Sequence, residues 1–224
     1  MEMIKIIHGD CRQVLKDLGT QVDDAIFVSD PPFNVGYKYH SYKDKLSQNE
    51  YDQLLIDVFG KRSHVLIHYP ESLYRHAINI KLAPTRVVSW IYNTNLPRQH
   101  RDIAFFNVTP DFTQVGQDYK NPQDKRVAKL IAEGRKAKLY DFWEITQVKN
   151  NSKEKTEHPC QMPIEVMKRI VGLLPKNKLI IDPFGGSGTT AVACAMLNRN
   201  CISIEIDDKY VGITEQRLLE VTTK

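Results

Sequence analysis

The segment Ser29-Asp30-Pro31-Pro32-Phe33-Asn34 follows a short apolar run at residues 25–28 and carries residue types suited to chemistry on an amine. Each proline fixes its own φ angle and lacks an N–H group, so the carbonyls of this segment are expected to be fixed and to face outward without a partner. The Asp30 carboxylate and the Pro31 carbonyl could together accept both hydrogens of one exocyclic amine, with the Phe33 ring stacked on the attached heterocycle. The segment therefore predicts a site for reaction at the amino group of a flat base.

The same residues also fit a β-turn without chemistry, in which Asp30 caps the turn and the two prolines end the strand. Taken alone, the four residues from Asp30 to Phe33 favour that turn. The catalytic interpretation therefore depends on a second motif elsewhere in the chain.

The second motif is Asp182-Pro183-Phe184-Gly185-Gly186-Ser187-Gly188-Thr189-Thr190, between an apolar strand at 179–182 and an apolar helix at 191–197. Glycines let a backbone approach a ligand where a Cβ atom would clash, and Glu205 at the end of the next strand is placed to accept both ribose hydroxyls of an adenosine. No lysine follows the glycines, as a phosphate-binding Walker loop would require, and Thr189 stands where a nucleophile elbow needs glycine. A tight turn with no ligand is the alternative, and Glu205 weakens it.

Length, composition and charge limit the kinds of protein that this chain can be. The chain has 224 residues, 42% apolar and 26% charged, which is ordinary for one globular domain. A net charge of +4 and a pI near 8.7 are compatible with a polyanionic partner. The four cysteines have no zinc or CxxC spacing, the first residues lack an export signal, and no apolar run could span a bilayer, so we expect reduced thiols and a cytoplasmic location without a membrane partner.

Strand and helix patterns alternate along the chain, which predicts an α/β fold with a doubly wound, mostly parallel sheet of seven strands. The expected strands are 4–7, 25–28, 64–69, 86–92, 102–108, 179–182 and 201–206, and 141–145 is a strand or extended piece that returns the chain to the sheet. The expected helices are 11–18, 49–60, 71–81, 164–174, 191–197 and a last one that Asp207 or Asp208 caps. The polar, tyrosine-rich residues 34–48 form a mobile loop, a candidate lid beside the site.

Residues 109–156 differ from the rest and look inserted. Asp124 could cap a helix with Val127, Leu130 and Ile131 facing inward. The outer side of that helix carries Lys125, Arg126 and Lys129, with further basic residues just beyond it. Such a run is usually only a solvated face, but its place in the one inserted segment favours contact with phosphates.

Together these motifs resemble the β class of S-adenosylmethionine-dependent amino-DNA methyltransferases, the N6-adenine and N4-cytosine type. In that class the Asp-Pro-Pro-aromatic motif comes first, a variable recognition segment follows, and the cofactor motif comes last. The segment His158-Pro159-Cys160-Gln161-Met162-Pro163 is similar to the family's His-Pro-Thr-Gln-Lys-Pro, and 141–145 is similar to the segment before it. Three departures stand out: Phe33 replaces the commoner Tyr, which preserves stacking, and Cys160 and Met162 replace Thr and Lys.

The resemblance implies one Rossmann-like methyltransferase domain over 1–224, with a DNA-recognition insertion at 109–156. The implied catalytic residues are Asp30, Pro31, Pro32 and Phe33. The implied residues for S-adenosylmethionine are Asp10, Asp30, His158, Gln161, Asp182, Phe184, Gly185, Gly186, Ser187, Gly188, Thr189, Thr190, Glu205 and Ile206. The implied DNA contacts are Asn95, Arg98, Lys125, Arg126 and Lys129, and Trp90 with Asn93 would lie in the loop bordering the target base. No metal is implied.

Asp10 has two interpretations. If the glycine strand is central and the Glu205 strand lies beside it, the next strand outward must be 4–7, because the chain ends after the following helix. Asp10 would then reach the adenine of the cofactor. It could equally cap the helix at 11–18.

The resemblance also sets the expected activity: methyl transfer to N6 of an adenine flipped out of the DNA, in a bacterial or phage-infected cell, alone, as a homodimer or with a restriction partner. An Asp-started motif is commoner among the adenine enzymes, and N4-cytosine or an RNA substrate are the alternatives. A small-molecule or protein methyltransferase, or a DNA-binding module without catalysis, are rivals. Salt-dependent DNA binding and transfer of a labelled methyl group would separate them.

Overall fold

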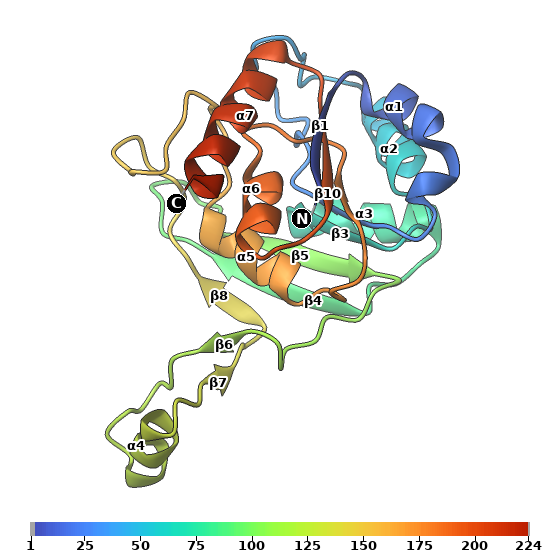
Figure 1. The fold of residues 1–224 in the computed structure, drawn as a ribbon. Coiled ribbons are helices and arrows are strands. Elements are labelled where there is room, and N and C mark those ends of the chain that lie inside the picture. Colours follow the sequence, from blue (N-terminus) through green and yellow to red (C-terminus); the bar gives the residue numbers. More distant parts are fainter. Residues whose placement is uncertain (1–2, 224) are drawn as a thin grey trace.

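Short strands form a mixed sheet whose central strands are buried on both faces (Figure 1). The computed structural model describes residues 3–223, and its main sheet has eight strands in the order β1-β10-β9-β2-β3-β5-β4-β8. The first five are parallel: β1 (Ile4–His8), β10 (Cys201–Glu205), β9 (Ile180–Asp182), β2 (Ile26–Ser29) and β3 (His64–His68). Strand β5 (His100–Phe106) is antiparallel to both β3 and β4 (Arg86–Ile91).

The eighth strand is the one beyond the expected seven. It is β8 (Phe142–Glu144), the segment expected to return the chain to the sheet, and it pairs parallel to β4 at the edge. At the opposite edge β1 pairs with β10, with His8 beside Glu205, which confirms that the N-terminal strand lies outside the Glu205 strand.

Helices cover the two faces and bury two separate cores. One face carries α1 (Cys11–Leu18), the short η1 (Gly19–Val22), α2 (Gln48–Val58) and α3 (Pro70–Ile80). The other carries α5 (Ile164–Gly172), α6 (Thr189–Met196) and α7 (Asp208–Thr222). Successive strand residues point to opposite faces, so Phe27 joins the first core while Ile26 and Val28 join the second. No helix in residues 3–223 is both long and apolar enough to cross a bilayer.

The start of α2 differs from the expected cap at Asn49. Ser47 caps it instead, accepting a hydrogen bond from the Glu50 N–H while the Glu50 carboxylate accepts from the Ser47 N–H. This reciprocal pair satisfies two backbone groups at once, which a cap at Asn49 would not. Asp207 and Asp124 cap α7 and α4 (Lys125–Ala132), as expected.

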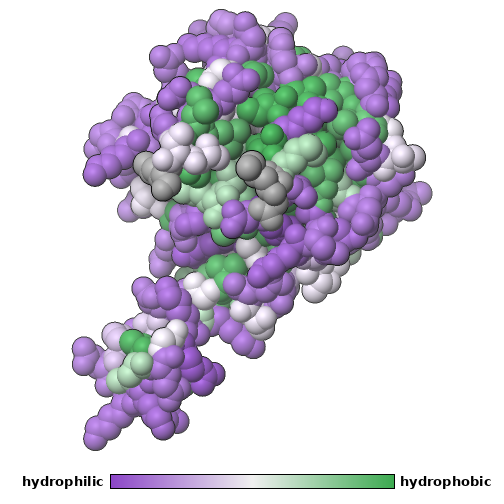
Figure 2. Space-filling model, in the orientation of Figure 1, coloured by the Kyte–Doolittle hydropathy of each residue, from purple (hydrophilic) through white to green (hydrophobic). Residues whose placement is uncertain are grey.

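A thin arm extends from the body of the molecule and carries α4 at its tip (Figure 1). Its stalk is the antiparallel pair β6 (Gly116–Gln117) and β7 (Ala137–Lys138), inside the inserted segment. The expected inward packing of α4 is wrong: the helix has no buried residue, and Ile131 is 44% exposed, because no sheet or helix of the body lies beneath it. The visible face of the arm is mostly hydrophilic (Figure 2).

Candidate active site

The two motifs meet at one edge of the sheet, although Ser29 and Asp182 are 153 positions apart in the chain. Strands β2 and β9 are hydrogen-bonded neighbours, with Ile26 beside Ile180, so both strands deliver their following loops to the same edge. The Ser29 hydroxyl donates to the Asp182 carboxylate at 3.1 Å, joining the two strand ends directly. Phe33 and Gly186 both line a single cavity of about 820 Å³.

Most of the predicted site residues line this cavity. They are Asp10, Asp30, Pro31, Pro32, Phe33, Arg98, His158, Asp182, Phe184, Gly185, Gly186, Ser187, Thr189, Thr190, Glu205 and Ile206. Six others are not among its lining residues: Asn95, Lys125, Arg126, Lys129, Gln161 and Gly188.

Asp30 lines the cavity, and its side chain is only 13% accessible. Its Oδ2 lies 3.5 Å from Nη1 of Arg101, and its Oδ1 is buried without a partner among the described residues. Burial raises the pKa of Asp30 to about 6; Arg101 opposes this shift, and Asp182 adds to it. A buried acceptor without a donor is unfavourable, so Oδ1 is set up to receive an N–H group from a ligand.

Phe33 is held against His68 of β3, with ring centroids 4.2 Å apart and planes 19° apart. The Tyr69 N–H donates to Nδ1 of His68, so a neutral imidazole carries its proton on Nε2 and donates to the Tyr51 hydroxyl at 2.8 Å. Burial lowers the pKa of His68 to about 3, which keeps the ring neutral. Tyr51 in turn donates to the Pro32 carbonyl at 2.6 Å.

The hydrogen bonds from His68 to Tyr51 and from Tyr51 to Pro32 correct the expectation that the carbonyls of this segment have no partner. The Pro32 carbonyl is already paired with Tyr51, whereas the Pro31 carbonyl accepts no hydrogen bond from a described residue. The free acceptors beside Phe33 are therefore Asp30 Oδ1 and the Pro31 carbonyl, the pair expected to bind an amine.

The glycines of the second motif let the turn itself pack closely, and the expected approach of a ligand to their backbone stays a prediction. A Cβ on Gly185 would overlap the Ser203 hydroxyl of β10, and one on Gly188 would overlap Thr214 of α7. Gly186 and Gly188 also have φ angles of +53° and +74°, which disfavour other residues. These glycines let the turn pack tightly against β10 and α7, and that packing places α6 and its N–H groups beside the cavity.

The remaining side chains of this motif brace the turn. Asp182 accepts hydrogen bonds from the Phe184 N–H and from the Thr190 hydroxyl, in addition to Ser29. Burial raises the pKa of Asp182 to about 6, against the lowering by these donors. Arg217 of α7 donates to the Ser187 carbonyl at 2.6 Å and to the Thr189 hydroxyl at 3.0 Å.

Glu205 lies at the end of β10 and is 9% exposed. Its two oxygens accept from the N–H groups of Gly186 at 2.6 Å and Asp207 at 2.9 Å, leaving further lone pairs for a diol. Burial raises its pKa, opposed by those N–H donors. Asp10 caps α1 through the Arg12 N–H and also lines the cavity, so both interpretations of this residue agree with its position.

The segment before α5 contributes His158 and Cys160 to the cavity. His158 packs edge-on against Tyr210 at 4.4 Å, and burial lowers its pKa to about 4. Gln161 lies outside the cavity: its amide binds Thr156 and the Glu154 carbonyl, so it closes the loop that presents His158.

The tyrosine-rich loop covers the cavity and has its own internal structure. Asp44 accepts from the backbone N–H groups of Asn34, Val35 and Tyr37, which folds the loop around one carboxylate. Three of its tyrosines line the cavity: Tyr37, Tyr39 and Tyr42.

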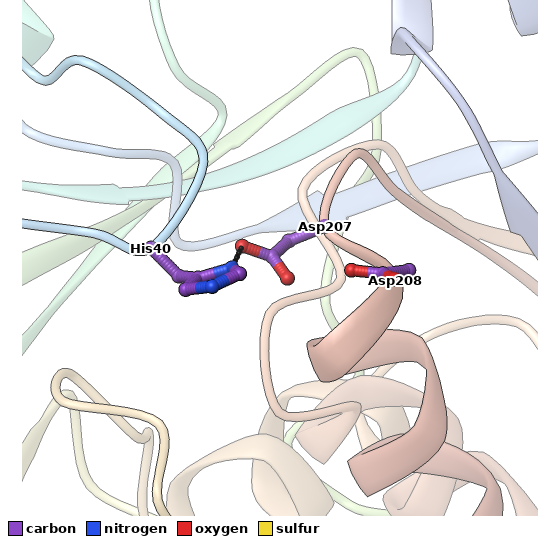
Figure 3. Close-up of side chains that lie close together, drawn as sticks. All are labelled: His40, Asp207 and Asp208. Carbon is purple, nitrogen blue, oxygen red and sulfur yellow. Dashed lines mark hydrogen bonds and ion pairs between the residues drawn. The ribbon is translucent and has the colours of Figure 1, made fainter.

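The tip of that loop is fastened to the start of α7. His40 Nδ1 lies 2.9 Å from Asp207 Oδ2 (Figure 3). The Ser41 hydroxyl donates to the same oxygen at 2.7 Å. Asp208 lies beside them, and the side chains of His40, Asp207 and Asp208 have nitrogen and oxygen atoms that could bind a cation. Both aspartates already accept from the Lys209 N–H, however, so hydrogen bonds account for this cluster as a loop fastening and a helix cap.

The candidate DNA contacts lie in two places. Arg98, in the loop between β4 and β5, stacks over Tyr69 at 4.1 Å, pairs with Glu71 and lies at the cavity, and Asn95 is exposed in the same loop. Lys125, Arg126 and Lys129 are exposed on α4 at the tip of the arm. Trp90 is buried and donates to the Ile145 carbonyl, so it supports the loop from below.

Three residues of this site escaped the sequence analysis. Arg101, His68 and Tyr51 come from β5, β3 and α2, and only tertiary packing brings them to the Asp-Pro-Pro-Phe segment. His68, a polar residue inside the expected apolar strand 64–69, was the available signal, whereas Arg101 fell in the loop expected before strand 102–108. A polar side chain needs a hydrogen-bond partner when it is buried, and here that partner belongs to the Asp-Pro-Pro-Phe segment or packs against it.

The cavity fits S-adenosylmethionine in its donor set. An acid with spare lone pairs, Glu205, lies beside the N–H-rich start of α6, and aromatic side chains from the loop above cover the cavity. Asp30 and Phe33 lie in the same cavity, so a methyl donor and an amine could face each other there.

Comparison with known proteins agrees with this geometry. A sequence model of the N6_N4_Mtase family, described as DNA methylase, matches residues 67–216. The chain is 25% identical over 249 residues to the DNA adenine methyltransferase YhdJ of Escherichia coli K12, covering 95% of this chain and 82% of that protein.

Two solved structures share the fold. The M1.HpyAVI–SAM complex superposes with a TM-score of 0.60 at 22% identity, covering 96% of this chain and all of that one. The cytosine-N4-specific PvuII DNA methyltransferase gives a TM-score of 0.67 at 16% identity, covering 98% and 90%. With more than half of its length matched and both motifs at one cavity, this chain belongs to the N6_N4_Mtase family of DNA methylases, with S-adenosylmethionine as the methyl donor.

Proposed function

We propose that this DNA methylase modifies the N6 amino group of adenine in a nucleotide flipped out of the duplex. The observation that carries the proposal is the free acceptor pair, Asp30 Oδ1 and the Pro31 carbonyl, beside the Phe33 ring. The Asp-started motif is commoner among adenine enzymes, and the similarity to YhdJ supports adenine. N4-cytosine is the second candidate, because the fold is shared with the PvuII enzyme.

The cofactor supplies an electrophilic methyl group on its sulfonium, and the chain's own residues prepare the amine. An aromatic amine is a poor nucleophile because its lone pair is delocalised into the ring. Asp30 and the Pro31 carbonyl, by accepting its two hydrogens, favour the pyramidal nitrogen of the transition state. The Tyr51–Pro32 bond keeps this segment rigid, and positioning alone can lower a barrier by up to ~7–11 kcal/mol.

No covalent enzyme intermediate is required, because an amine can attack the methyl group directly. The cysteine nearest the reaction, Cys160, has its thiol pKa raised by burial, and burial raises the pKa of Cys11 to about 12. Neither thiol is therefore prepared as a nucleophile.

The target base must leave the helix to reach Asp30, at a cost of roughly a few kcal/mol. Stacking on an aromatic ring returns on the order of 1–3 kcal/mol per base, and phosphate contacts can supply the rest. We expect Arg98, which lines the cavity, and the exposed basic residues on α4 to make such contacts.

The identity of the base is tested by expressing the protein in a host without DNA methylation and digesting the DNA to nucleosides for mass spectrometry. N6-methyladenosine in the digest supports the proposal, and the Asp30→Ala variant should abolish it. N4-methylcytosine in the digest would show that cytosine is the target base and would overturn the assignment to adenine. DNA affinity should also fall steeply with salt concentration, whereas a small-molecule methyltransferase would show no such dependence.

The rate of methyl transfer should fall as the pH decreases through about 6, the pKa of Asp30. Above that pH the carboxylate accepts the amine hydrogens, and below it the added proton occupies the acceptor. Single-turnover rates with saturating cofactor and DNA between pH 5 and 8 measure this fall in the rate of methyl transfer.

Asp182 titrates in the same range, so cofactor affinity must be followed across the same pH series. Its protonation would loosen the glycine turn and weaken cofactor binding, whereas protonation of Asp30 would leave binding intact. A rate that is flat from pH 5 to 8 contradicts the assigned role of Asp30.

The tyrosine-rich loop should act as a lid, with backbone hydrogen exchange in residues 34–47 slowing when cofactor and DNA bind together. Replacing His40 and Ser41 by Ala removes two bonds to Asp207 and should weaken cofactor binding about fivefold, which corresponds to about 1 kcal/mol. Lys45→Ala is the control in the same loop, because its exposed side chain has no hydrogen bond or ion pair to a described residue. Unchanged exchange on binding would rule out the lid.

A further inference from the structure

The seat for the target base is filled by a side chain of the protein itself. Arg101, on β5, has Nη1 3.5 Å from Asp30 Oδ2 and its guanidinium carbon 4.6 Å from the centroid of the Phe33 ring. Its side chain is 16% exposed and lines the same cavity. The guanidinium is a planar group with N–H donors, which makes it similar in shape and hydrogen bonding to an amino-substituted base.

The Phe33 ring has no second face to offer a base while Arg101 is there. His68 stacks on the ring with its plane inclined by only 19°, so it covers one face. The guanidinium stands over the ring as well, and the stacked imidazole leaves it only the other face. A base that stacks on Phe33 and donates to Asp30 Oδ1 would therefore need the ring face that Arg101 now covers.

We propose that Arg101 gates the target-base pocket: it occupies the seat between Phe33 and Asp30 in the enzyme without DNA, and it must swing out before the flipped base can enter. This inference rests on the proposed reaction at a flipped base, but not on which base is methylated.

The contacts of Arg101 are suited to a side chain that moves. Its Nε is buried without a partner among the described residues, and its bond to Asp30 is at the long limit. Its other neighbours are the Met162 sulfur at 3.8 Å, the Tyr92 side chain, with which it shares a hydrogen bond, and the Trp90 ring at 5.4 Å; none of these is a carboxylate or a backbone carbonyl. A fixed structural arginine would be bound by several carbonyl groups, as Arg199 is by those of Val171, Leu174 and Pro175.

Replacing a gating residue and replacing a residue that binds the base should change DNA affinity in opposite directions. If the pocket is closed most of the time, the apparent affinity for DNA is reduced by the open fraction, so a gate closed about 90% of the time costs about tenfold. Removing the gate should tighten binding of the flipped base, whereas removing a base contact should weaken it.

The test compares Arg101→Met, which keeps length and loses the charged fork, with Arg86→Met on the neighbouring strand as control, since Arg86 is half exposed and paired with Asp141. The probe is a duplex carrying the methylated sequence found in the host DNA, with an abasic site opposite the target base, so that the base is already released. Dissociation constants are measured at pH 8 with S-adenosylhomocysteine, where Asp30 is ionised.

Arg101→Met should bind this duplex about five- to tenfold more tightly than the unaltered enzyme, while a duplex lacking the sequence is bound equally or more weakly. Arg86→Met should match the unaltered enzyme on both. Weaker binding of the target duplex by Arg101→Met would overturn the gate and make Arg101 a base contact. Arg101→Lys, which keeps the charge without the planar fork, should fall between, and it replaces Arg101→Met if that variant fails to fold. Loss of all methylation by the unaltered enzyme would instead refute the proposed function.

Discussion

Replacing Asp30 by Ala should reduce methyl transfer by at least ~10³-fold while S-adenosylmethionine binds within about twofold of its normal affinity. The reason is that different parts of the cavity are expected to bind the base and the cofactor. Asp30 lies beside Phe33, whereas Glu205 ends β10 and the glycine turn follows β9. The amine would lose its charged acceptor and keep only the Pro31 carbonyl. Single-turnover kinetics gives the rate, and isothermal titration calorimetry gives the cofactor affinity.

Stability provides the control for this variant. Burial raises the pKa of Asp30, so the ionised side chain disfavours the folded state at pH 8, but its removal also takes away the carboxylate beside Arg101. Because these two effects oppose each other, the melting temperature should change little. Joint loss of cofactor binding and transfer would assign Asp30 a structural role. Full activity in Asp30→Ala would remove the basis of the mechanism.

Replacing Gly188 by Ala should destabilise the protein by about 2–4 kcal/mol, combining an overpacked contact with a left-handed backbone. The added Cβ would overlap Thr214 of α7, and the φ angle of +74° is unfavourable for alanine. A melting temperature lower by on the order of 10 °C is expected, together with weaker cofactor binding, because the turn that begins α6 must shift.

Two further variants separate the causes of that loss. Gly212→Ala, in the middle of α7 with open space around its Cβ, should instead stabilise the protein by about 0.5–1 kcal/mol. Adding Thr214→Ala to Gly188→Ala should recover the part due to overlap and leave the part due to backbone conformation. Equal stability of Gly188→Ala and the unaltered protein would refute the packing role assigned to this glycine.

The sequence alone determined the order and type of most elements, because apolar runs and caps are local signals. The exact bounds of α1 and the cap of α4 at Asp124 followed from it, and the strand order β9, β10, β1 followed from the family resemblance. It missed the Ser47 cap of α2 and the solvated setting of α4, since period and composition do not reveal whether a body lies beneath a helix.

The sequence also determined which residue types meet, because parallel strands bring their following loops to one edge of a sheet. Asp30, Phe33, Gly186 and Glu205 share a cavity for that reason. Only the tertiary structure decided what surrounds them. Arg101, His68 and Tyr51 come from three other elements, and their roles depend on contacts of a few ångströms that no pattern in the chain encodes. The fold specifies the meeting of the two motifs, and side-chain packing specifies that the seat for the base is closed by an arginine.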